Sequence, residues 1–201
     1  EQWPAATALR FLRTAGDKLN RFPSHPLPFA VHNLYGPTED TVWTTLADVS
    51  WPENNNDVPD IGYALDNKHI FILSQRNQLL PQGCIGELCI AGAGLARGYI
   101  NQPELTAQRF ISLQLPATNN PEKNNPENSN SENSNSENRK TLRVYKTGDL
   151  ARIKENGSLE FIGRNDNQVK IRGFRIELGE IEQQLIHLPG IQEAVVIPLA
   201  D

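Results

Sequence analysis

The sequence contains no methionine and only two cysteines, Cys84 and Cys89. Because translation starts at methionine, we expect the chain to be an excerpt of a longer protein. The two cysteines stand five residues apart in a strand-like run, without a histidine cluster beside them. That setting argues against metal binding or nucleophilic chemistry at either thiol. A reducing cytoplasm is the simplest location to expect.

Long apolar runs, a secretory leader and an excess of positive charge are also missing. No run approaches the roughly 18 residues that cross a bilayer, and the start, EQWPAATALR, lacks the basic and apolar regions of a signal peptide. The formal net charge is −5, and the 19 Lys and Arg residues are scattered. We therefore expect a soluble globular protein whose partners include neither nucleic acid nor membrane.

The first hundred residues predict short strands separated by turns. The run LRFL at 9–12 stops at a Gly-Asp pair, which predicts a buried strand followed by a loop. A second strand is predicted at 30–34, and it breaks at Gly36-Pro37. From 61 to 100 the runs HIFIL and GELCIAG lie on either side of a Pro-Gln-Gly turn. This segment predicts a sheet or a small barrel.

The second half begins with a segment of unusual composition. Residues 119–138 are almost all Asn, Ser, Glu and Pro, so we expect a disordered insertion at about 117–140. Two strand runs then flank Glu155-Asn156-Gly157 as a hairpin. QVKIRG alternates like a strand, and the next run has apolar residues at helical spacing at 178, 181, 185 and 188. A boundary near Asp166 is expected.

Four longer strings carry more information than any short catalytic signature. The phosphate loop GxxxxGK[ST], the metal helix HExxH and the nucleophile elbow GxSxG are absent. Present instead are NLYGPTE at 33–39, GELCIAGAGLARGYINQPELTAQRF at 86–110, YKTGDL at 145–150 and GRNDNQVKIRGFRIELGEIE at 163–182. In this order and spacing they resemble the adenylation domains of nonribosomal peptide synthetases, within the adenylate-forming superfamily of acyl-CoA synthetases and luciferases. The resemblance covers nearly the whole chain except the insertion.

The resemblance implies an α/β fold in two parts. Residues 1–165 would form the C-terminal part of the large adenylation subdomain, with sheets and a distorted barrel. Residues 166–201 would begin the small α+β C-terminal subdomain. Asp166 matches the hinge between the two, where a residue must absorb large backbone rotations. Lys170 and Gly173 match positions beside the tunnel for a phosphopantetheine thiol, where a glycine leaves room for the arm.

The resemblance also assigns a nucleotide site to NLYGPTE. Asn33 would contact the adenine edge, and Tyr35 would stack on the base beside the close backbone of Gly36. Thr38 would contact the α-phosphate, and Glu39 would hold Mg²⁺, a hard cation that favours oxygen ligands. Taken alone, the same residues would be an ordinary turn with a capping threonine and a solvated glutamate.

Two further residues are implied at the ribose. Asp149 in YKTGDL would accept hydrogen bonds from the 2′ and 3′ hydroxyls, and Arg164 would also reach the ribose. In isolation, Gly-Asp is more often a turn, and an arginine more often a surface ion pair. In the string GELCIAGAGLARGY we expect a structural role, with Arg97 and Tyr99 packing the sheet near the nucleotide.

The amino-acid pocket is implied at five positions, which are Arg13, Ala15, Leu34, Val42 and Trp43. A tryptophan and a leucine would fill volume and favour a small substrate side chain such as glycine or cysteine. Arg13 stands where an apolar residue is usual, so it could instead pair with a polar or acidic substrate. Both alternatives stay open.

The implied reaction uses ATP and Mg²⁺ to convert an amino acid into an aminoacyl-AMP. The acyl group would then pass to the phosphopantetheine of a carrier protein, with condensation domains as further partners, in secondary metabolite biosynthesis. The phosphate loop would precede Glu1 and the catalytic lysine would follow Asp201, so we expect the excerpt alone to be inactive. The alternatives are an acyl- or aryl-CoA ligase of the same superfamily and a non-catalytic remnant, which the insertion and Arg13 would suggest.

Overall fold

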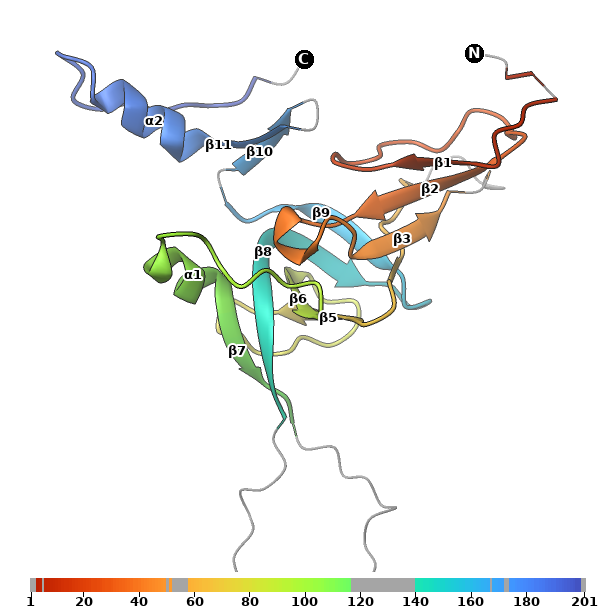
Figure 1. Cartoon of the computed structure of the whole chain (residues 1–201), viewed down its shortest axis with the longest axis horizontal. Coiled ribbons are helices and arrows are strands. Elements are labelled where there is room, and N and C mark those ends of the chain that lie inside the picture. The colour runs from red at the N-terminus through yellow and green to blue at the C-terminus, as the bar shows by residue number, and fades with distance from the viewer. Residues whose placement is uncertain are drawn as a thin grey trace, which may run out of the picture.

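A computed structural model describes residues 3–4, 6–49, 51, 58–116, 140–166, 168–171 and 174–199. Within these ranges the chain forms three β-sheets, two α-helices and one short 3₁₀ helix (Figure 1). Neither described α-helix is long and apolar enough to cross a membrane. The predicted disordered insertion at 117–140 falls, apart from its last residue, outside the described ranges.

The N-terminal sheet has four strands in the order β1-β2-β3-β4. They span Phe11–Thr14, Ala30–Tyr35, Thr45–Asp48 and Tyr63–Ala64. β1 runs parallel to β2, and the other pairs are antiparallel. As predicted, β2 ends where the Gly-Pro turn begins. A short 3₁₀ helix, η1 (Thr38–Asp40), follows that turn.

The prediction that the run at 9–12 is buried was wrong. β1 forms there, but Phe11 is 47% exposed and Leu12 is 42% exposed. The physical reason is position in the sheet, because β1 is an edge strand whose ladder partner among the described residues is β2. An apolar run predicts a strand, but burial also requires a second layer to pack on it.

The central sheet has five antiparallel strands and contains the most buried part of the chain. Four follow the order β5-β6-β8-β7, and β9 pairs with β8. They span Lys68–Leu73, Gly86–Gly92, Thr141–Ile153, Phe110–Gln114 and Leu159–Arg164, in that order of naming. Leu88, Ile90, Val144 and Tyr145 are fully buried. The short helix α1 (Pro103–Arg109) leads directly into β7. The expected sheet over 61–100 is therefore confirmed.

The predicted hairpin joins β8 to β9. Gly157 has a φ of +85°, a conformation that side chains on L-residues rarely adopt. The Gly157 amide donates to the carbonyl of Lys154 at 2.9 Å, which closes the turn. Asn-Gly at this point allows β8 to reverse direction within a few residues. The hairpin brings Asp149 on β8 opposite Arg164 on β9.

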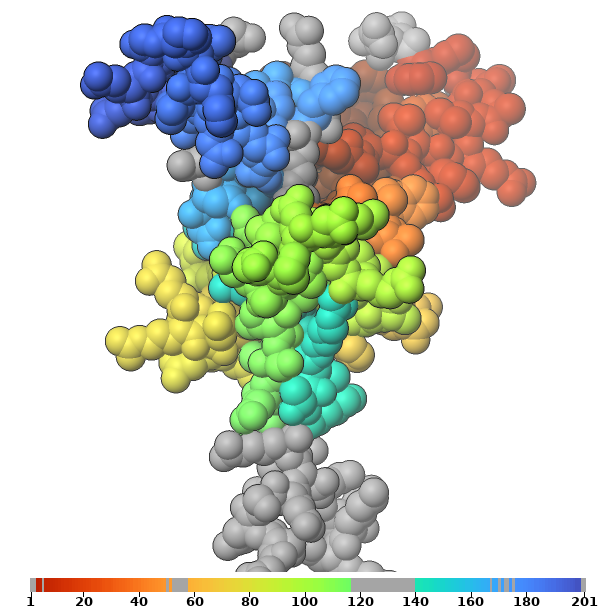
Figure 2. Space-filling view, turned by 60° about the vertical axis from the view of Figure 1, so that its left-hand side comes forward, coloured from red at the N-terminus to blue at the C-terminus, as the bar shows by residue number. Residues whose placement is uncertain are grey.

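A separate two-stranded sheet follows, with β10 (Gln168–Ile171) antiparallel to β11 (Phe174–Glu177). The helix α2 (Leu178–Ile186) comes next, as its apolar spacing predicted, although position 188 lies beyond its end. Leu178 is buried, whereas Ile181 is 40% exposed. This unit and the N-terminal sheet lie at the same end of the molecule, away from the tip of β7 (Figures 1 and 2).

Candidate functional site

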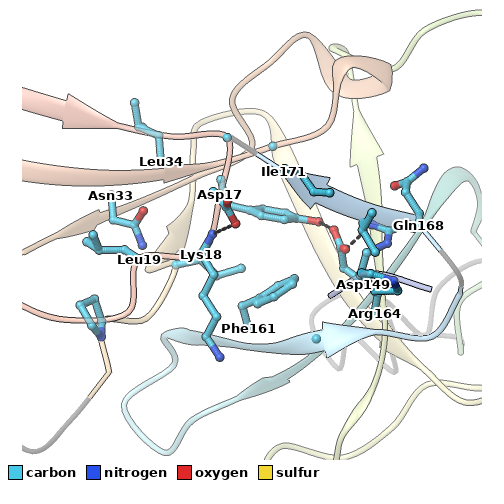
Figure 3. Close-up of a pocket in the computed structure, with 18 of the residues that line it drawn as sticks. Asp17, Lys18, Leu19, Asn33, Leu34, Asp149, Phe161, Arg164, Gln168 and Ile171 are labelled. Carbon is cyan, nitrogen blue, oxygen red and sulfur yellow. Dashed lines mark hydrogen bonds and ion pairs between the residues drawn. The ribbon is translucent and has the colours of Figure 1, made fainter. Parts of the chain in front are cut away.

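A cavity of about 450 Å³ lies where six segments of the described residues meet. They are the loop after β1 (16–19), the end of β2 (33–36), the segment before β4 (59–61), the β8–β9 hairpin, β10 and the segment 198–199. Six predicted site residues line it, and these are Asn33, Leu34, Tyr35, Gly36, Asp149 and Arg164. Figure 3 shows the asparagine and leucine at one side of the cavity and the Asp149–Arg164 pair at the other. Residues 114 positions apart in the sequence therefore share one site.

Asp149 is held by hydrogen bonds to both of its carboxylate oxygens. The Tyr35 hydroxyl donates to Oδ2 at 2.5 Å, and Nη1 of Arg164 donates to Oδ1 at 2.5 Å. The preceding Gly148 has a φ of +77°. A Cβ on this glycine would approach Asp166 Oδ2 to 2.5 Å and Arg164 Nη2 to 2.7 Å. Glycine is therefore required for the turn that delivers the carboxylate.

Tyr35 contributes both an apolar wall and a proton donor. Burial, together with the negative charge of Asp149, raises the pKa of its phenol well above the ordinary value. The phenol therefore stays protonated and donates its hydrogen bond to Asp149. The Phe161 ring lies 6.3 Å away, centre to centre, and is tilted by 40°. Both aromatic rings line the cavity, which gives a flat ligand an apolar surface to contact.

Asn33 is buried, and a backbone contact fixes its side chain. Its amide nitrogen donates to the carbonyl of Asp60 at 2.8 Å. Asp60 precedes β4 and also accepts a hydrogen bond from the Ser158 hydroxyl at 2.6 Å. The N-terminal sheet and the β8–β9 hairpin are thus tied together directly beside the cavity.

Arg164 joins Asp149 to Asp166. Its Nε and Nη2 donate to the two carboxylate oxygens of Asp166 at 2.7 and 2.8 Å, while Nη1 bonds Asp149. Arg109 adds a longer contact to Asp166 at 3.4 Å. Burial pushes the pKa of Asp166 upward, but the hydrogen bonds and charge of Arg164 outweigh this and hold the pKa below the ordinary value. The predicted hinge residue is therefore an ionised partner of the cavity arginine, beside the cavity but outside its lining.

Thr38 and Glu39 lie on η1, the turn that follows Gly36, and not among the cavity-lining residues. Glu39 is buried, and its Oε1 accepts a hydrogen bond from the Tyr99 hydroxyl at 2.7 Å. Tyr99 also packs against the core of the central sheet, as expected. Arg97 does not: its side chain is exposed, and its contact with the sheet is made by its backbone carbonyl, which accepts a hydrogen bond from Arg143 at 2.8 Å.

The predicted amino-acid pocket is only partly assembled among the described residues. Leu34 lines the cavity, whereas Arg13, Ala15, Val42 and Trp43 do not. The Arg13 guanidinium lies 5.3 Å from the centre of the Trp43 ring, so these two predicted residues contact each other. Trp43 and Val42 remain exposed.

Of the two predicted thiol-tunnel positions, Lys170 and Gly173, the structure describes only the backbone of Lys170. The backbone of Lys170 lies on β10. Its side chain, and the whole of Gly173, lie outside the described residues.

Two supporting groups escaped the sequence analysis. Glu87 on β6 is buried, and it accepts a hydrogen bond from the Gly148 amide at 3.1 Å and pairs with Lys146 at 3.2 Å. Asp40 is completely buried and pairs with Lys68 at 2.7 Å. For Glu87 the available signal was a charged residue inside the apolar run GELCIAG, since such a residue is rarely buried without a partner. Asp40 lies in a polar stretch, where no such signal exists.

The described residues form no cluster of three or more His, Cys, Asp or Glu side chains that could hold a metal ion. Glu39 offers a single carboxylate. One or two protein carboxylates together with substrate phosphates are the usual surroundings of Mg²⁺. The donor set therefore fits Mg²⁺ that arrives with a nucleotide better than a resident metal centre.

The chain is similar in sequence to known proteins. The family model described as AMP-binding enzyme matches residues 5–100. One of the linear gramicidin synthase proteins of Brevibacillus parabrevis is 43% identical over 200 residues, covering 100% of this chain and 4% of that relative. Bacitracin synthase 1 of Bacillus licheniformis is 43% identical over 194 residues, covering 96% of this chain and 3% of its own length. The chain therefore spans only a small part of the length of these curated relatives.

Solved structures show the same fold. Holo-PA1221, a nonribosomal peptide synthetase protein containing adenylation and PCP domains, matches with a TM-score of 0.71 and 33% identity. The match covers 92% of this chain and 29% of that one. The Vibrio cholerae adenylation domain AlmE, in complex with glycyl-adenosine-5′-phosphate, matches with a TM-score of 0.70 and 25% identity over 95% of this chain and 33% of its own. The chain is therefore similar to the AMP-binding enzymes over residues 5–100 and to a part of nonribosomal peptide synthetases over its whole length, and it has the α/β fold of part of an adenylation domain.

Proposed function

We propose that the protein carrying this chain activates an amino acid with ATP and passes it to the phosphopantetheine thiol of a carrier protein. The amino-acid carboxylate would attack the α-phosphorus of ATP, giving an aminoacyl-AMP and releasing pyrophosphate. The observation that carries the proposal is the meeting of Tyr35, Asp149 and Arg164 in one cavity. An aromatic wall beside a buried carboxylate and a guanidinium suits the base and ribose of a nucleotide.

In this proposal the cavity residues bind the nucleoside. The base stacks on Tyr35 beside Phe161, and Asn33 contacts its edge. Asp149 accepts hydrogen bonds from the ribose hydroxyls, while Arg164 holds that carboxylate in place and adds a donor. Support comes from the contacts already present, because Tyr35 and Arg164 orient Asp149 before a ligand arrives. Such preorganisation reduces the ordering that binding must cause.

The turn after Gly36 would bind the phosphates of ATP. Thr38 would contact the α-phosphate, and Glu39 would hold Mg²⁺, which would supply positive charge to neutralise the ATP phosphates. The buried position of Glu39 and its bond from Tyr99 support this role. Positioning and charge neutralisation supply most of the catalysis in phosphate chemistry of this kind.

We further infer two subdomains, 1–165 and 166–201, with Asp166 as the hinge between them. The end of β9 at Arg164 and the start of a separate sheet at Gln168 support a division here. Lys170 and Gly173 would border the path of the thiol. Carrier and condensation domains would be the partners, in the cytoplasm, and holo-PA1221 contains adenylation and PCP domains.

The substrate has two candidates. A small amino acid is favoured if Leu34 and Trp43 fill the pocket, and a polar or acidic one if the Arg13 guanidinium faces it. Arg13 lies over the rings of Trp43 and Phe11, 5.3 and 4.7 Å from their centres. That stacking leaves its charge available for a carboxylate, as guanidinium groups often stack and form ion pairs together.

Amino-acid-dependent ATP–pyrophosphate exchange by the full-length protein tests the proposal. A panel should include glycine, cysteine, aspartate, glutamate, aryl acids and fatty acids. We expect exchange with one or a few amino acids. Asp149→Ala should lower it about a hundredfold, as expected when a ligand loses its positioning, whereas Asp48→Ala, at an exposed position on β3, should leave it unchanged.

Other results would redirect the proposal. Exchange with aryl or fatty acids alone would indicate a CoA ligase of the same superfamily. No exchange with any acid would indicate a non-catalytic remnant. Equal loss in Asp149→Ala and Asp48→Ala would show that the effect of the first is not local to the cavity.

A further inference from the structure

The loop 94–99 is bonded both to Glu39 and to Thr41, the residue that follows η1. The backbone amide of Ala96 donates to the Glu39 carbonyl at 2.7 Å, and the Thr41 hydroxyl donates to the Gly94 carbonyl at 2.7 Å. The helix η1 has only three residues, so it cannot position a side chain by its own hydrogen bonds. The orientation of Glu39 therefore depends on a loop that is about 60 residues further along the chain.

Tyr99 delivers its hydroxyl to Oε1 of Glu39 from a fixed ring. Its backbone amide donates to the Thr106 hydroxyl at 2.9 Å, in helix α1. Its ring packs edge-on against Phe110 at 5.8 Å, and its hydroxyl lies 3.4 Å from that of Tyr145. Because both the backbone and the ring of Tyr99 are held, its hydroxyl fixes the rotation of the Glu39 carboxylate.

A buried ion pair between Asp40 and Lys68 lies beside this arrangement and packs against both η1 and the loop 94–99. Asp40 accepts hydrogen bonds from Lys68 Nζ at 2.7 Å and from the Thr44 hydroxyl at 2.7 Å. Lys68 also donates to the Asp40 carbonyl at 3.0 Å. A Cβ at Gly94 would lie 2.0 Å from Lys68 Nζ and 2.9 Å from Asp40 Oδ1. The loop 94–99 and η1 are therefore packed against the same ion pair.

We propose that Tyr99 is a positioning residue for the divalent cation that accompanies ATP. It holds the Glu39 carboxylate in one orientation before the cation binds, so that binding requires little reordering. The proposal rests on the role of Glu39 in the proposed function. Groups that orient a metal ligand commonly change metal affinity by 10- to 100-fold when they are removed.

The test compares MgATP with metal-free ATP by calorimetric titration of the full-length protein. Tyr99→Phe keeps the packed ring and removes only the hydroxyl, so the fold is retained. We expect its affinity for MgATP to fall roughly tenfold, with its affinity for ATP in chelator unchanged. Tyr63→Phe is the matched control, because the Tyr63 hydroxyl is exposed and bonds only weakly, at 3.4 Å, to the Asn156 carbonyl. Glu39→Gln should abolish the gain in affinity that Mg²⁺ gives.

Each alternative outcome has a distinct meaning. If Glu39→Gln loses the magnesium-dependent gain while Tyr99→Phe keeps it, the positioning role is wrong and the proposed function stands. Equal loss of affinity for both forms of ATP in Tyr99→Phe would also overturn it, since that pattern indicates a structural role. If the wild-type protein binds neither form, the proposed function fails first.

Discussion

The central sheet and the C-terminal unit, β10–β11–α2, show similar apolar patterns but differ in burial. Leu88 and Val144 in the central sheet are fully buried. Phe174 and Ile181 in the C-terminal unit are 73% and 40% exposed. Periodicity predicts the elements of both regions equally well, whereas burial depends on whether a second layer covers them. As far as the structure describes the two regions, the central sheet has that cover on most of its apolar side chains, whereas in the C-terminal unit Leu178 is buried but Phe174 and Ile181 are not.

The difference coincides with a division of tasks in the proposed function. The central sheet and the turn after β2 supply the nucleotide-binding groups, which require fixed geometry. The C-terminal unit follows Asp166, where movement is proposed. A rigid platform beside a less anchored unit is what an enzyme with a moving part requires, since mobile elements come from the less stable parts of a fold.

Lys68→Ala should have the largest effect and tests the rigidity of the platform. Asp40 would be left as an unpaired charge at a fully buried position. We expect the local free energy of opening to fall by about 3–5 kcal/mol. Hydrogen exchange of the peptides that cover η1 and β5 in the full-length protein measures it.

The matched control is Arg152→Ala, which removes the ion pair with Glu160 on the partly exposed face of β8 and β9. Its effect should stay below about 1 kcal/mol, since exposed pairs contribute little. If the two variants lose the same stability, the hydrogen bond from Thr44 is enough to stabilise buried Asp40. The Asp40–Lys68 ion pair would then not explain the rigidity of this region.

A pair of core truncations compares the two regions directly. Leu88→Ala on β6 should lower the local stability by about 2–5 kcal/mol, because it opens a cavity in a fully buried position. Ile181→Ala on α2 should cost about 1 kcal/mol or less. Hydrogen exchange of the β6 and α2 peptides reports each effect. Equal losses would mean that the C-terminal unit is packed as firmly as the sheet, which would remove the contrast.

The smallest effect is expected from Asp166→Asn, at the junction between β9 and β10. The pKa of Asp166 is held below its ordinary value in the folded state, so ionisation stabilises the fold above about pH 3.9. That contribution disappears as the pH falls through the lowered pKa. At pH 6 the free energy of local opening around Asp166 should be lower in the variant by about 1 kcal/mol. The effect is this small because Asp166 is partly exposed and solvent screens its charge.

Once the pH is below the lowered pKa of Asp166, the two proteins should become equivalent. Hydrogen exchange of residues 160–171, corrected for the intrinsic rate at each pH, follows the difference. A difference that persists in acid would mean that Asp166 acts through packing and not through its charge.

The elements and the site differed in how far the sequence could predict them. Strands β2, β5, β6 and the β8–β9 hairpin follow from local patterns, because turn residues and alternation act over a few positions. The meeting of Tyr35 with Asp149 came from family resemblance, since no local pattern spans 114 residues. The bonds of Glu87 to Gly148 and of Lys68 to Asp40 link residues 61 and 28 positions apart. Such pairings depend on which strands and turns the whole fold brings together, and local sequence patterns of a few residues do not reveal this.

Gly36 sets a limit on any attempt to change the substrate by protein engineering. A Cβ there would lie 2.3 Å from the carbonyl oxygen of Val42 and 2.7 Å from the amide of Thr44. The strand end and the 41–44 loop are thus in backbone contact, and neither can shift without the other. Libraries that randomise Val42 and Trp43 should therefore leave Gly36 constant. Val42 itself has a φ of +72°, unusual for a β-branched residue, so glycine or asparagine at that position is the first replacement to include in such a library.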